Sequence, residues 1–386
     1  MASDRIPQQM KAQVLTEYSQ PYTLKDLSVP ELASDNDILI KVDAAGVRDI
    51  EVAIMVDADQ SQQYCHTDAV LAAGQMKPNP PKFPHVGSHE FAGTVVKTSS
   101  SSDKTCPVGT RVGVPGRGYH ICGTCFECKD PNNDYAGYSN FCGKGLSNGL
   151  SKDGGFAEYA VVDARQVALL PDAMSAANAA PLMCAGVTIY RALKRCRLSA
   201  GQRVGIMGCG GGLGHLGLQF AEAMGLKTTG VDAADGPLKL ANSLSLKNVR
   251  VVDARSTKAD ALVKEIGEQD GVEDRPNMGL DAVIILPESQ ASFEYGCSIL
   301  KNHGLCVVVS FPEGGFNVSA RDLVFRDISV VGTLLGTNSD LQEMVSFASK
   351  HNIKAISKTY SLAKLNELVD EYNKGEGGKL VVDMAL

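Results

Sequence analysis

Four cysteines in one short stretch of the chain have the spacing of metal ligands. Two residues separate Cys122 from Cys125 and Cys125 from Cys128, and Cys142 follows after thirteen intervening residues. Four thiolates in one lobe suit a closed tetrahedral zinc site, which has no open position for a substrate. A redox Cys-x-x-Cys pair or unrelated buried thiols are the alternatives, and the even spacing disfavours both. The sequence therefore predicts a structural zinc lobe over residues 119–143.

A second group of candidate ligands is dispersed along the chain: Cys65, His89 with Glu90, and Cys184. Each has a structural explanation by itself. Cysteine is among the most often buried residue types, and a lone histidine more often lies in the core or on the surface than binds a metal. Spacing alone does not join these residues into one site.

A glycine-rich segment, VGIMGCGGGLGHLGLQFAEAMG, has the pattern of a strand, a tight turn and an amphipathic helix. Glycines let a backbone turn tightly and approach a pyrophosphate, whose charge is met by the helix N-terminus. The strict G-x-G-x-x-G spacing starts too late for this turn. We therefore interpret the turn as a longer pattern made of Gly208, Gly211, Gly212, Leu213 and Gly214. A turn that only packs the helix closely is the alternative.

Asp232 favours the interpretation as a nucleotide site. It ends the strand-like run TTGVD, eighteen residues after Gly214. A carboxylate at that place can accept hydrogen bonds from both ribose hydroxyls of a dinucleotide and repels a 2′-phosphate. Since no arginine follows Asp232 closely in the sequence, NAD is predicted in preference to NADP.

The elements that must position these residues fall into two regimes. Up to about Cys184, short β-type runs (38–42, 93–97, 111–114 and 157–162) are broken by Gly, Pro and Ser clusters, which indicates a strand-rich domain. From Arg203, apolar strands alternate with helices, which predicts an α/β fold with a Rossmann-type doubly wound parallel sheet. Strands are expected at 203–207, 228–231, 249–252, 281–286, 305–310 and 328–332, and helices at 213–224 and 289–300. We expect a catalytic domain at 1–186, a nucleotide-binding domain at 187–328 and a return to the catalytic domain at 329–386.

The composition excludes several classes of function. A chain of 386 residues with 44% hydrophobic and 21% charged residues is typical of a globular protein of two domains. Its net charge of −7 argues against nucleic acid as the main partner. It contains no apolar run of the roughly 18 residues that span a membrane, and it begins without a signal-peptide pattern. We therefore expect a cytoplasmic protein whose eleven cysteines are thiols or metal ligands.

The motifs occur in the order CHTD, PHVGSHEFAG, APLMCAGVTIYRAL and GCGGGLGHLGLQFAEAMG. With them the chain resembles the zinc-dependent medium-chain alcohol dehydrogenases, most closely their yeast-like branch, from about Gln13 to Asp383. The resemblance implies a GroES-like catalytic domain and an enzyme that transfers hydride between an alcohol and NAD, forming an aldehyde or ketone. It also implies two zinc ions per chain, one catalytic and one structural, and a homodimer or homotetramer.

The same resemblance assigns roles at the catalytic zinc. Cys65, His89 and Cys184 would hold the metal and leave one position open, with Glu90 as an occasional fourth ligand. Thr67 would hydrogen-bond the alcohol oxygen and pass its proton on, and Asp68 would orient the His89 ring.

Three further residues are expected to contact the cofactor. His66 would approach the pyrophosphate, Thr188 would approach the nicotinamide, and Lys379 stands where the family has a cofactor-binding arginine.

Other departures from the family bear on the substrate. Val70 replaces the family's relay histidine, and Met76 replaces a pocket tryptophan in a chain that contains no tryptophan. A pliable methionine there suggests a wider pocket and a substrate larger than ethanol. The loop before Cys142 is six residues longer than usual, which a surface lobe tolerates. These features fit a dedicated role in specialised metabolism as well as general fermentation.

Seventeen residues, Val47 to Gln63, interrupt the family pattern directly before CHTD. Their removal leaves AAGYCHTDAV, which restores the pattern, and seventeen codons keep the reading frame. Our hypothesis is a retained intron, and the alternative is a genuine loop over the pocket. Because a metal ligand must be placed within roughly 0.5 Å, either origin threatens the catalytic zinc. The alternatives to an alcohol dehydrogenase are a zinc-free reductase of an activated double bond and an inactive NAD-binding or structural protein.

Overall fold

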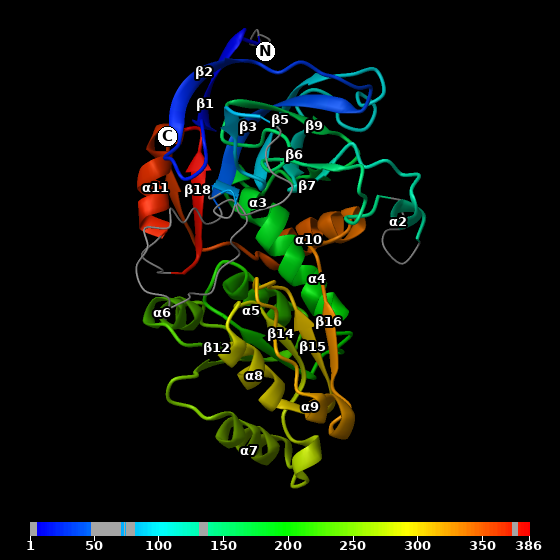
Figure 1. Ribbon diagram of the computed structural model, residues 1–386, viewed down its shortest axis with the longest axis vertical. Coiled ribbons are helices and arrows are strands. Elements are labelled where there is room, and N and C mark those ends of the chain that lie inside the picture. The colour runs from blue at the N-terminus through cyan, green and yellow to red at the C-terminus, as the bar shows by residue number, and fades with distance from the viewer. Residues whose placement is uncertain (1–5, 48–70, 73, 75–81, 131–137, 373–376) are drawn as a thin grey trace.

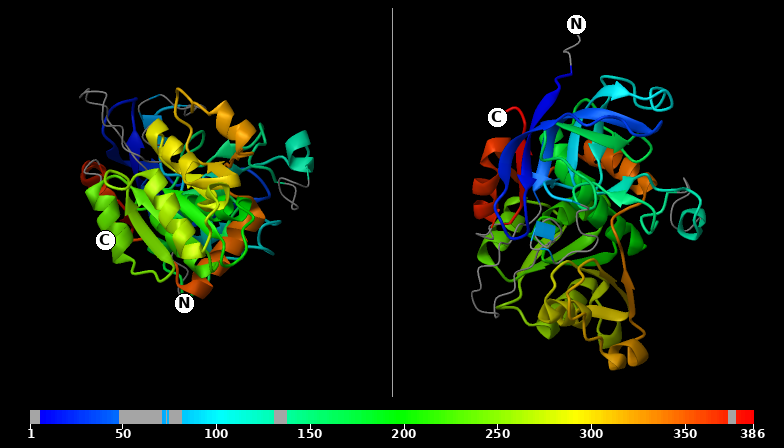
Figure 2. Two further views of the ribbon diagram at one scale, coloured as in Figure 1. Left: turned by 90° about the horizontal axis from the view of Figure 1, so that it is seen from below. Right: turned by 45° about the horizontal axis from the view of Figure 1, so that its top comes forward.

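The computed structural model describes residues 6–47, 71–72, 74, 82–130, 138–372 and 377–386. Strands from both ends of the chain lie together in the upper part of Figure 1, and the middle of the chain forms the lower part. The right-hand view of Figure 2 likewise shows the dark blue strands in the upper half and the yellow elements at the bottom. Among the described helices, none is both long and apolar enough to cross a membrane.

The lower part is built on a parallel sheet. Its described strands are β11 (Arg203–Met207), β12 (Lys227–Asp232), β13 (Val249–Asp253), β14 (Leu280–Ile285), β15 (Leu300–Val308) and β16 (Ser329–Gly332). They lie in the order β13-β12-β11-β14-β15-β16, which is the order of the Rossmann fold. The connecting helices are α5 (Gly214–Ala223), α6 (Asp235–Ser243), α7 (Ala259–Asp270), α8 (Gln290–Ser298) and α9 (Ala320–Phe325), with a 3₁₀ turn at Arg275–Asn277. The order reverses between β11 and β14, where ligands of such sheets bind.

The predicted boundary between the helix at 289–300 and the strand at 305–310 is wrong. The helix expected to reach residue 300 ends at Ser298, and β15 begins at Leu300 instead of residue 305. Leu300 pairs with Leu280, after which the register shifts before Leu305 pairs with Ala282. Polar residues occupy positions 301–303, so the apolar pattern did not reveal this irregular start of the strand.

The upper part is strand-rich. Its main sheet contains β10 (Ala168–Leu169), β6 (Arg111–Val114), β5 (Phe91–Thr98), β3 (Asp37–Val47), β18 (Lys379–Asp383) and β17 (Ser357–Tyr360), with β9 (Tyr159–Asp163) also paired to β3. Smaller sheets contain β2 (Thr23–Ser28), β1 (Gln9–Leu15) and β4 (His85–Val86), and β7 (Arg117–Tyr119) with β8 (Leu146–Ser147). Because β18 runs antiparallel to β3, the end of the chain returns to the first sheet.

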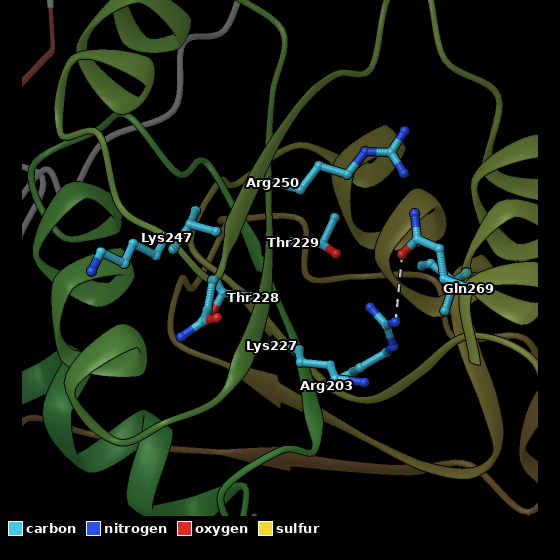
Figure 3. Close-up of a pocket in the computed structure, with 10 residues that line it drawn as sticks. Arg203, Lys227, Thr228, Thr229, Lys247, Arg250 and Gln269 are labelled. Atoms are coloured by element: carbon cyan, nitrogen blue, oxygen red, sulfur yellow. Dashed lines mark hydrogen bonds between the residues drawn. The ribbon is translucent and has the colours of Figure 1, made fainter.

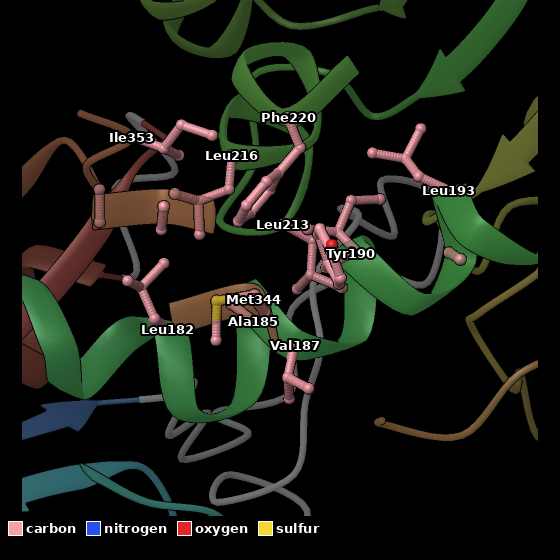
Figure 4. Packing of buried hydrophobic residues seen from close by; sticks show 14 of the residues in the cluster. Leu182, Ala185, Val187, Tyr190, Leu193, Leu213, Leu216, Phe220, Met344 and Ile353 are labelled. Carbon is pink, nitrogen blue, oxygen red and sulfur yellow. The ribbon is translucent and has the colours of Figure 1, made fainter. Parts of the chain in front are cut away.

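The helices of this part include those that meet the Rossmann sheet. They are α2 (Phe126–Lys129), α3 (Ala176–Pro181), α4 (Val187–Arg195), α10 (Asn338–His351) and α11 (Leu365–Tyr372), with a π-helix at Leu182–Gly186 and a 3₁₀ turn at Leu362–Lys364. Figure 4 shows α4, α5 and α10 sharing one apolar core. The rings of Tyr190 and Phe220 lie 5.3 Å apart there, and Met344 is fully buried beside them. This shared core ties the two parts together by apolar burial.

Candidate functional site

The structure brings the four cysteines of the predicted zinc lobe together. Cys122, Cys125, Cys128 and Cys142 place their Sγ atoms within 4.8 Å of one another. The Cys142 sulfur lies 3.6 Å from that of Cys122 and 3.9 Å from that of Cys125. Sulfurs bound to one tetrahedral zinc at about 2.3 Å lie about 3.8 Å apart, so this arrangement fits the metal. The lobe carries α2 and projects to the side of the molecule (Figure 1).

Backbone groups prepare part of this lobe for a cation. The Thr124 and Cys125 N–H groups point at the Cys122 sulfur from 3.4 and 3.3 Å. Hydrogen bonding from Thr124 lowers the pKa of Cys122 to about 5, whereas burial raises the pKa of Cys128 to about 12. Because the thiolate is the form that binds metal, Cys122 is ready to do so near neutral pH.

Of the three residues expected to bind the catalytic zinc, the structure describes His89 and Cys184. Both are buried, and the segments that carry them are in contact. His89 precedes β5, and Cys184 lies in the π-helix between α3 and α4. They are 2% and 1% exposed. The Ala185 N–H, directly after Cys184, donates to Glu90 Oε2 at 3.4 Å. Single-turn π-helices often occur at functional sites, and this one presents Cys184. The other expected residues of this site, Cys65, His66, Thr67 and Asp68, lie outside the described residues.

Glu90 forms a buried ion pair with Lys379, the first residue of β18. Both side chains are almost fully buried, so each charge depends on the other. Gly46 packs against Glu90 so closely that an added Cβ would collide with the carboxylate. With Oε1 on Lys379 and Oε2 facing Ala185, both carboxylate oxygens are already engaged. The pairing therefore competes with the expected role of Glu90 as a metal ligand.

Lys379 also reaches the glycine turn. Its Cδ lies 3.2 Å from where a Cβ of Gly212 would stand. The turn joins β11 to α5, and its first glycine, Gly208, has a φ of 77° that favours glycine. An added Cβ at Gly214 would collide with the Gly208 carbonyl. The α5 N-terminus has no side-chain cap, although its His215 N–H donates to the Gly211 carbonyl at 3.1 Å, and the end of a helix in this position favours a phosphate.

The sequence interpretation of this turn left Gly210 as a free position, and that was wrong. A Cβ at Gly210 would collide with the Pro237 carbonyl. The Gly210 N–H donates to Asp232 Oδ2 at 3.0 Å, and the second oxygen of Asp232 accepts from Ala233 at 2.8 Å. Burial raises the pKa of Asp232. Asp232 therefore fixes the turn and still has lone pairs free for ribose hydroxyls.

A cavity of about 270 Å³ opens beside the turn, and its lining includes Gly208, Asp232, Arg255, Ser289 and Tyr295. Arg255 was missed from the sequence because it lies far beyond Asp232 in the chain, on the segment after β13. Its guanidinium is held by two carboxylates, Asp253 at 2.8 Å and Asp235 at 2.6 Å. The arginine thus faces the same cavity as Asp232 with its charge already compensated.

A second cavity of about 300 Å³ lies where β11, β12 and β13 begin (Figure 3). Two of the cations that line it are paired with carboxylates: Arg203 contacts Asp270 at 2.5 Å, and Arg250 contacts Glu265 at 2.5 Å. Lys227, which shares Asp270 at 3.2 Å, and Lys247 also line this cavity.

His215 and Thr188 are both held by the backbone. The Ile356 N–H donates to His215 Nε2 at 3.1 Å, so the proton sits on Nδ1, which donates to the Gly211 carbonyl at 2.8 Å. Burial lowers the pKa of His215 to about 4. The neutral ring thereby joins the glycine turn to the segment before β17. The Thr188 hydroxyl donates to the Cys184 carbonyl at 2.6 Å and ties α4 to the π-helix.

Comparisons with known proteins agree with this geometry. Residues 34–172 match the family model "Alcohol dehydrogenase GroES-like domain", and residues 212–350 match "Zinc-binding dehydrogenase". An alcohol dehydrogenase of Geobacillus stearothermophilus is 34% identical over 376 residues, which are 97% of this chain and 99% of the relative. The chain belongs to the zinc-dependent medium-chain alcohol dehydrogenases.

Solved structures of similar proteins agree with this assignment. The alcohol dehydrogenase of Aeropyrum pernix superposes with a TM-score of 0.78 at 28% identity, covering 97% of this chain and 99% of its own. The acetophenone reductase of Geotrichum candidum in complex with NAD superposes with a TM-score of 0.75 at 25% identity, covering 98% of both chains. The predicted Rossmann and GroES-like fold, the assignment as an alcohol dehydrogenase, and zinc with a nicotinamide cofactor are confirmed at the level of the family.

Three residues of this medium-chain dehydrogenase were missed as site residues from the sequence: Gly210, His215 and Arg255. Gly210 lies among four other glycines within seven residues, so its strict requirement could not be told from theirs. His215 had no spacing signal, because its partner Ile356 lies 141 residues away. Only the parallel pairing of β12 with β13 brings Arg255 near Asp232.

Proposed function

We propose that the protein is a zinc- and NAD-dependent alcohol dehydrogenase that interconverts an alcohol with an aldehyde or a ketone. One observation carries this proposal: Lys379 touches both halves of the machinery. Its ammonium pairs with Glu90, which follows His89, and its stem packs on the glycine turn at Gly212. Lys379 thereby joins the segment that carries His89 to the dinucleotide turn, and hydride transfer between a metal-bound alcohol and a nicotinamide needs the two sites close together.

The proposed metal sites follow the residues. Cys122, Cys125, Cys128 and Cys142 would hold a structural zinc. The catalytic zinc would be held by Cys65, His89 and Cys184. Glu90 would stay paired with Lys379 and would bind the metal only as an occasional fourth ligand. Catalytic zinc supplies Lewis-acid chemistry, which polarises a carbonyl and lowers the pKa of an alcohol.

The chain's own side chains would orient the reactants and move the proton. Thr67 would accept the proton of the alcohol, and Asp68 would fix the tautomer of His89. Because Val70 replaces the relay histidine, the proton would leave through the cofactor ribose and water.

NAD is proposed as the preferred cofactor. Asp232 would accept from the ribose hydroxyls and repel a 2′-phosphate. Arg255, which could attract that phosphate, is already paired with two carboxylates. The pyrophosphate would be bordered by His66, Gly208, Gly211, Gly212 and Leu213. Thr188 would contact the nicotinamide, and Lys379 would contact the cofactor from beside Gly212.

Further parts of the proposal concern the protein's setting. We propose that it acts in the cytoplasm as a homodimer or homotetramer on a substrate larger than ethanol, in specialised metabolism. The catalytic domain would comprise residues 1–186 and 329–386, and residues 187–328 would bind the cofactor.

Elemental analysis and cofactor titration of the purified full-length protein test the proposal. We expect two zinc ions per chain, tighter binding of NADH than of NADPH, and NAD-dependent oxidation of larger alcohols. One zinc per chain with NADH binding but no turnover would favour an inactive protein, and restoring activity by deleting 47–63 would trace the defect to that segment. Zinc-independent reduction of an activated double bond would contradict the proposal.

A further inference from the structure

The connector between the Rossmann sheet and α10 has a fixed shape. The chain leaves β16 at Gly332 and begins α10 at Asn338. Between them Leu335 has a φ of 49°, a conformation that few non-glycine residues adopt. Thr337 caps α10 in a reciprocal capping box with Asp340. A connector with an unusual backbone angle needs partners that hold it in place.

Asn140, in the four-cysteine lobe, supplies such a contact. Its side-chain amide donates to the carbonyls of Leu334 at 3.2 Å and Gly336 at 2.7 Å, on either side of Leu335. The side chain is 8% exposed and lies two residues before Cys142. The buried amide of Asn140 therefore connects the lobe to the residues directly before and after Leu335.

A second set of contacts links the C-terminal end of the connector, at Asn338, to the lobe through Arg165. Asn338 donates to the carbonyl of Arg165 and to Gln166 Oε1, at 3.1 and 3.0 Å. The guanidinium of Arg165 lies 5.3 Å from the centre of the Tyr138 ring, which belongs to the lobe. The connector is therefore held on both sides by the lobe and its neighbours.

On its other side the connector touches the helix of the catalytic site. An added Cβ at Gly336 would collide with Val187, the first residue of α4. Val187 lies between Cys184, a candidate zinc ligand, and Thr188, whose hydroxyl bonds the Cys184 carbonyl. A continuous set of contacts therefore runs from Cys142 through Asn140 and Gly336 to the π-helix that presents Cys184.

We propose that Asn140 is a positioning residue that couples the four-cysteine lobe to the cofactor cleft by fixing the 333–337 connector. The inference rests on the proposed NAD site. It means that the four-cysteine lobe contributes to cofactor binding as well as to its own folding. When the lobe is intact, Asn140 holds Gly336 against α4, and the two parts of the chain keep the relative placement that the cofactor requires. Without that contact the connector relaxes and the cofactor binds less tightly.

The test compares Asn140→Ala with Asn366→Ala, a control whose amide also makes two hydrogen bonds to the backbone, those of Tyr22, away from the connector. NADH affinity by fluorescence, zinc per chain and thermal unfolding are measured for each. We expect N140A to keep its zinc and to bind NADH roughly threefold to thirtyfold more weakly, the range of such couplings. N366A should bind NADH as the wild type does. If N140A does not fold, N140S, which keeps one hydroxyl donor, takes its place.

A double-mutant cycle separates positioning from simple structural support. Cys142→Ser disrupts the lobe, and we expect it to weaken NADH binding in the wild type but to add little in N140A, because the connection is already broken. Full additivity, or wild-type affinity in N140A, would overturn the inference. A wild-type protein that binds no NADH would instead refute the proposed function.

Discussion

Acid should destabilise this protein through His215, and replacing that residue should remove the effect. The ring is fully buried, with its Nε2 accepting from Ile356 and its Nδ1 donating to Gly211. Protonation would put a hydrogen on Nε2, against the Ile356 N–H, and would add a positive charge near Lys379. Burial and this neighbouring charge lower the pKa of His215 to about 4, from 6.5.

The sign and size of the effect follow from linkage. A histidine whose pKa is depressed by folding contributes stability that is present above pH 6.5 and lost as pH falls towards 4, because the unfolded chain binds the proton first. A difference between 6.5 and about 4 corresponds to about 3.4 kcal/mol once pH is below both values. At pH 5 the loss amounts to about 2 kcal/mol.

Urea unfolding of the wild type and of His215→Asn at pH 7.5 and pH 5.0 measures this loss. The asparagine amide can still donate to Gly211 but leaves the Ile356 N–H without an acceptor, which costs roughly 1–3 kcal/mol. We expect the wild type to be more stable by that amount at pH 7.5, and its advantage to shrink by about 2 kcal/mol at pH 5.0. His303→Asn, at an exposed position, controls for the substitution itself. An advantage that is the same at both pH values would refute the reasoning.

Two further substitutions test the contacts around the cofactor turn. Gly210→Ala should weaken NADH binding by roughly five- to 150-fold, because the new Cβ meets the Pro237 backbone and costs about 1–3 kcal/mol; Gly314→Ala, where the space is open, should bind NADH normally. Equal affinities in a fluorescence titration would contradict this. Lys379→Met should lower the free energy of unfolding by about 3–5 kcal/mol by leaving Glu90 buried without a partner, and adding Glu90→Gln should recover most of the loss. If the double variant is no more stable than K379M in thermal unfolding, the ion pair is not the cause.

The Rossmann half of the fold was predictable because its signal is local. Strands buried on both faces read as continuous apolar runs, and Arg203–Met207 was placed at its observed bounds. The cysteine lobe was predictable for the same reason, since three of its ligands lie within seven residues. In contrast, β2 (Thr23–Ser28) is almost wholly exposed and has no alternating pattern, so no signal in the sequence indicates this strand.

The contacts that join the halves could not be read from the sequence. Glu90 and Lys379 were each singled out, but for separate roles, and only the register of β18 on β3 brings them together. Nothing in a one-dimensional pattern says that Asn140 will face the connector or that His215 will face Ile356. Such contacts depend on how two folded parts meet, which local propensity does not encode.

The same register limits what the inserted segment can do. In β3, Ala45 pairs with Val382 and Val47 with Leu380, so the first inserted residue still belongs to the sheet. The Gly46 N–H donates to the Glu90 carbonyl at 2.7 Å, and the Ser88 hydroxyl donates to the Gly46 carbonyl at 2.9 Å. Gly46 is therefore fixed on both backbone sides and has no room for a side chain. Whether residues 47–63 arise from an intron or a loop, the chain enters them from a fixed point beside the Glu90–Lys379 pair. Among the described residues, the Cys184 carbonyl accepts from Thr188 and Glu90, next to His89, is paired with Lys379, so we expect any defect caused by the segment to act first on the placement of Cys65.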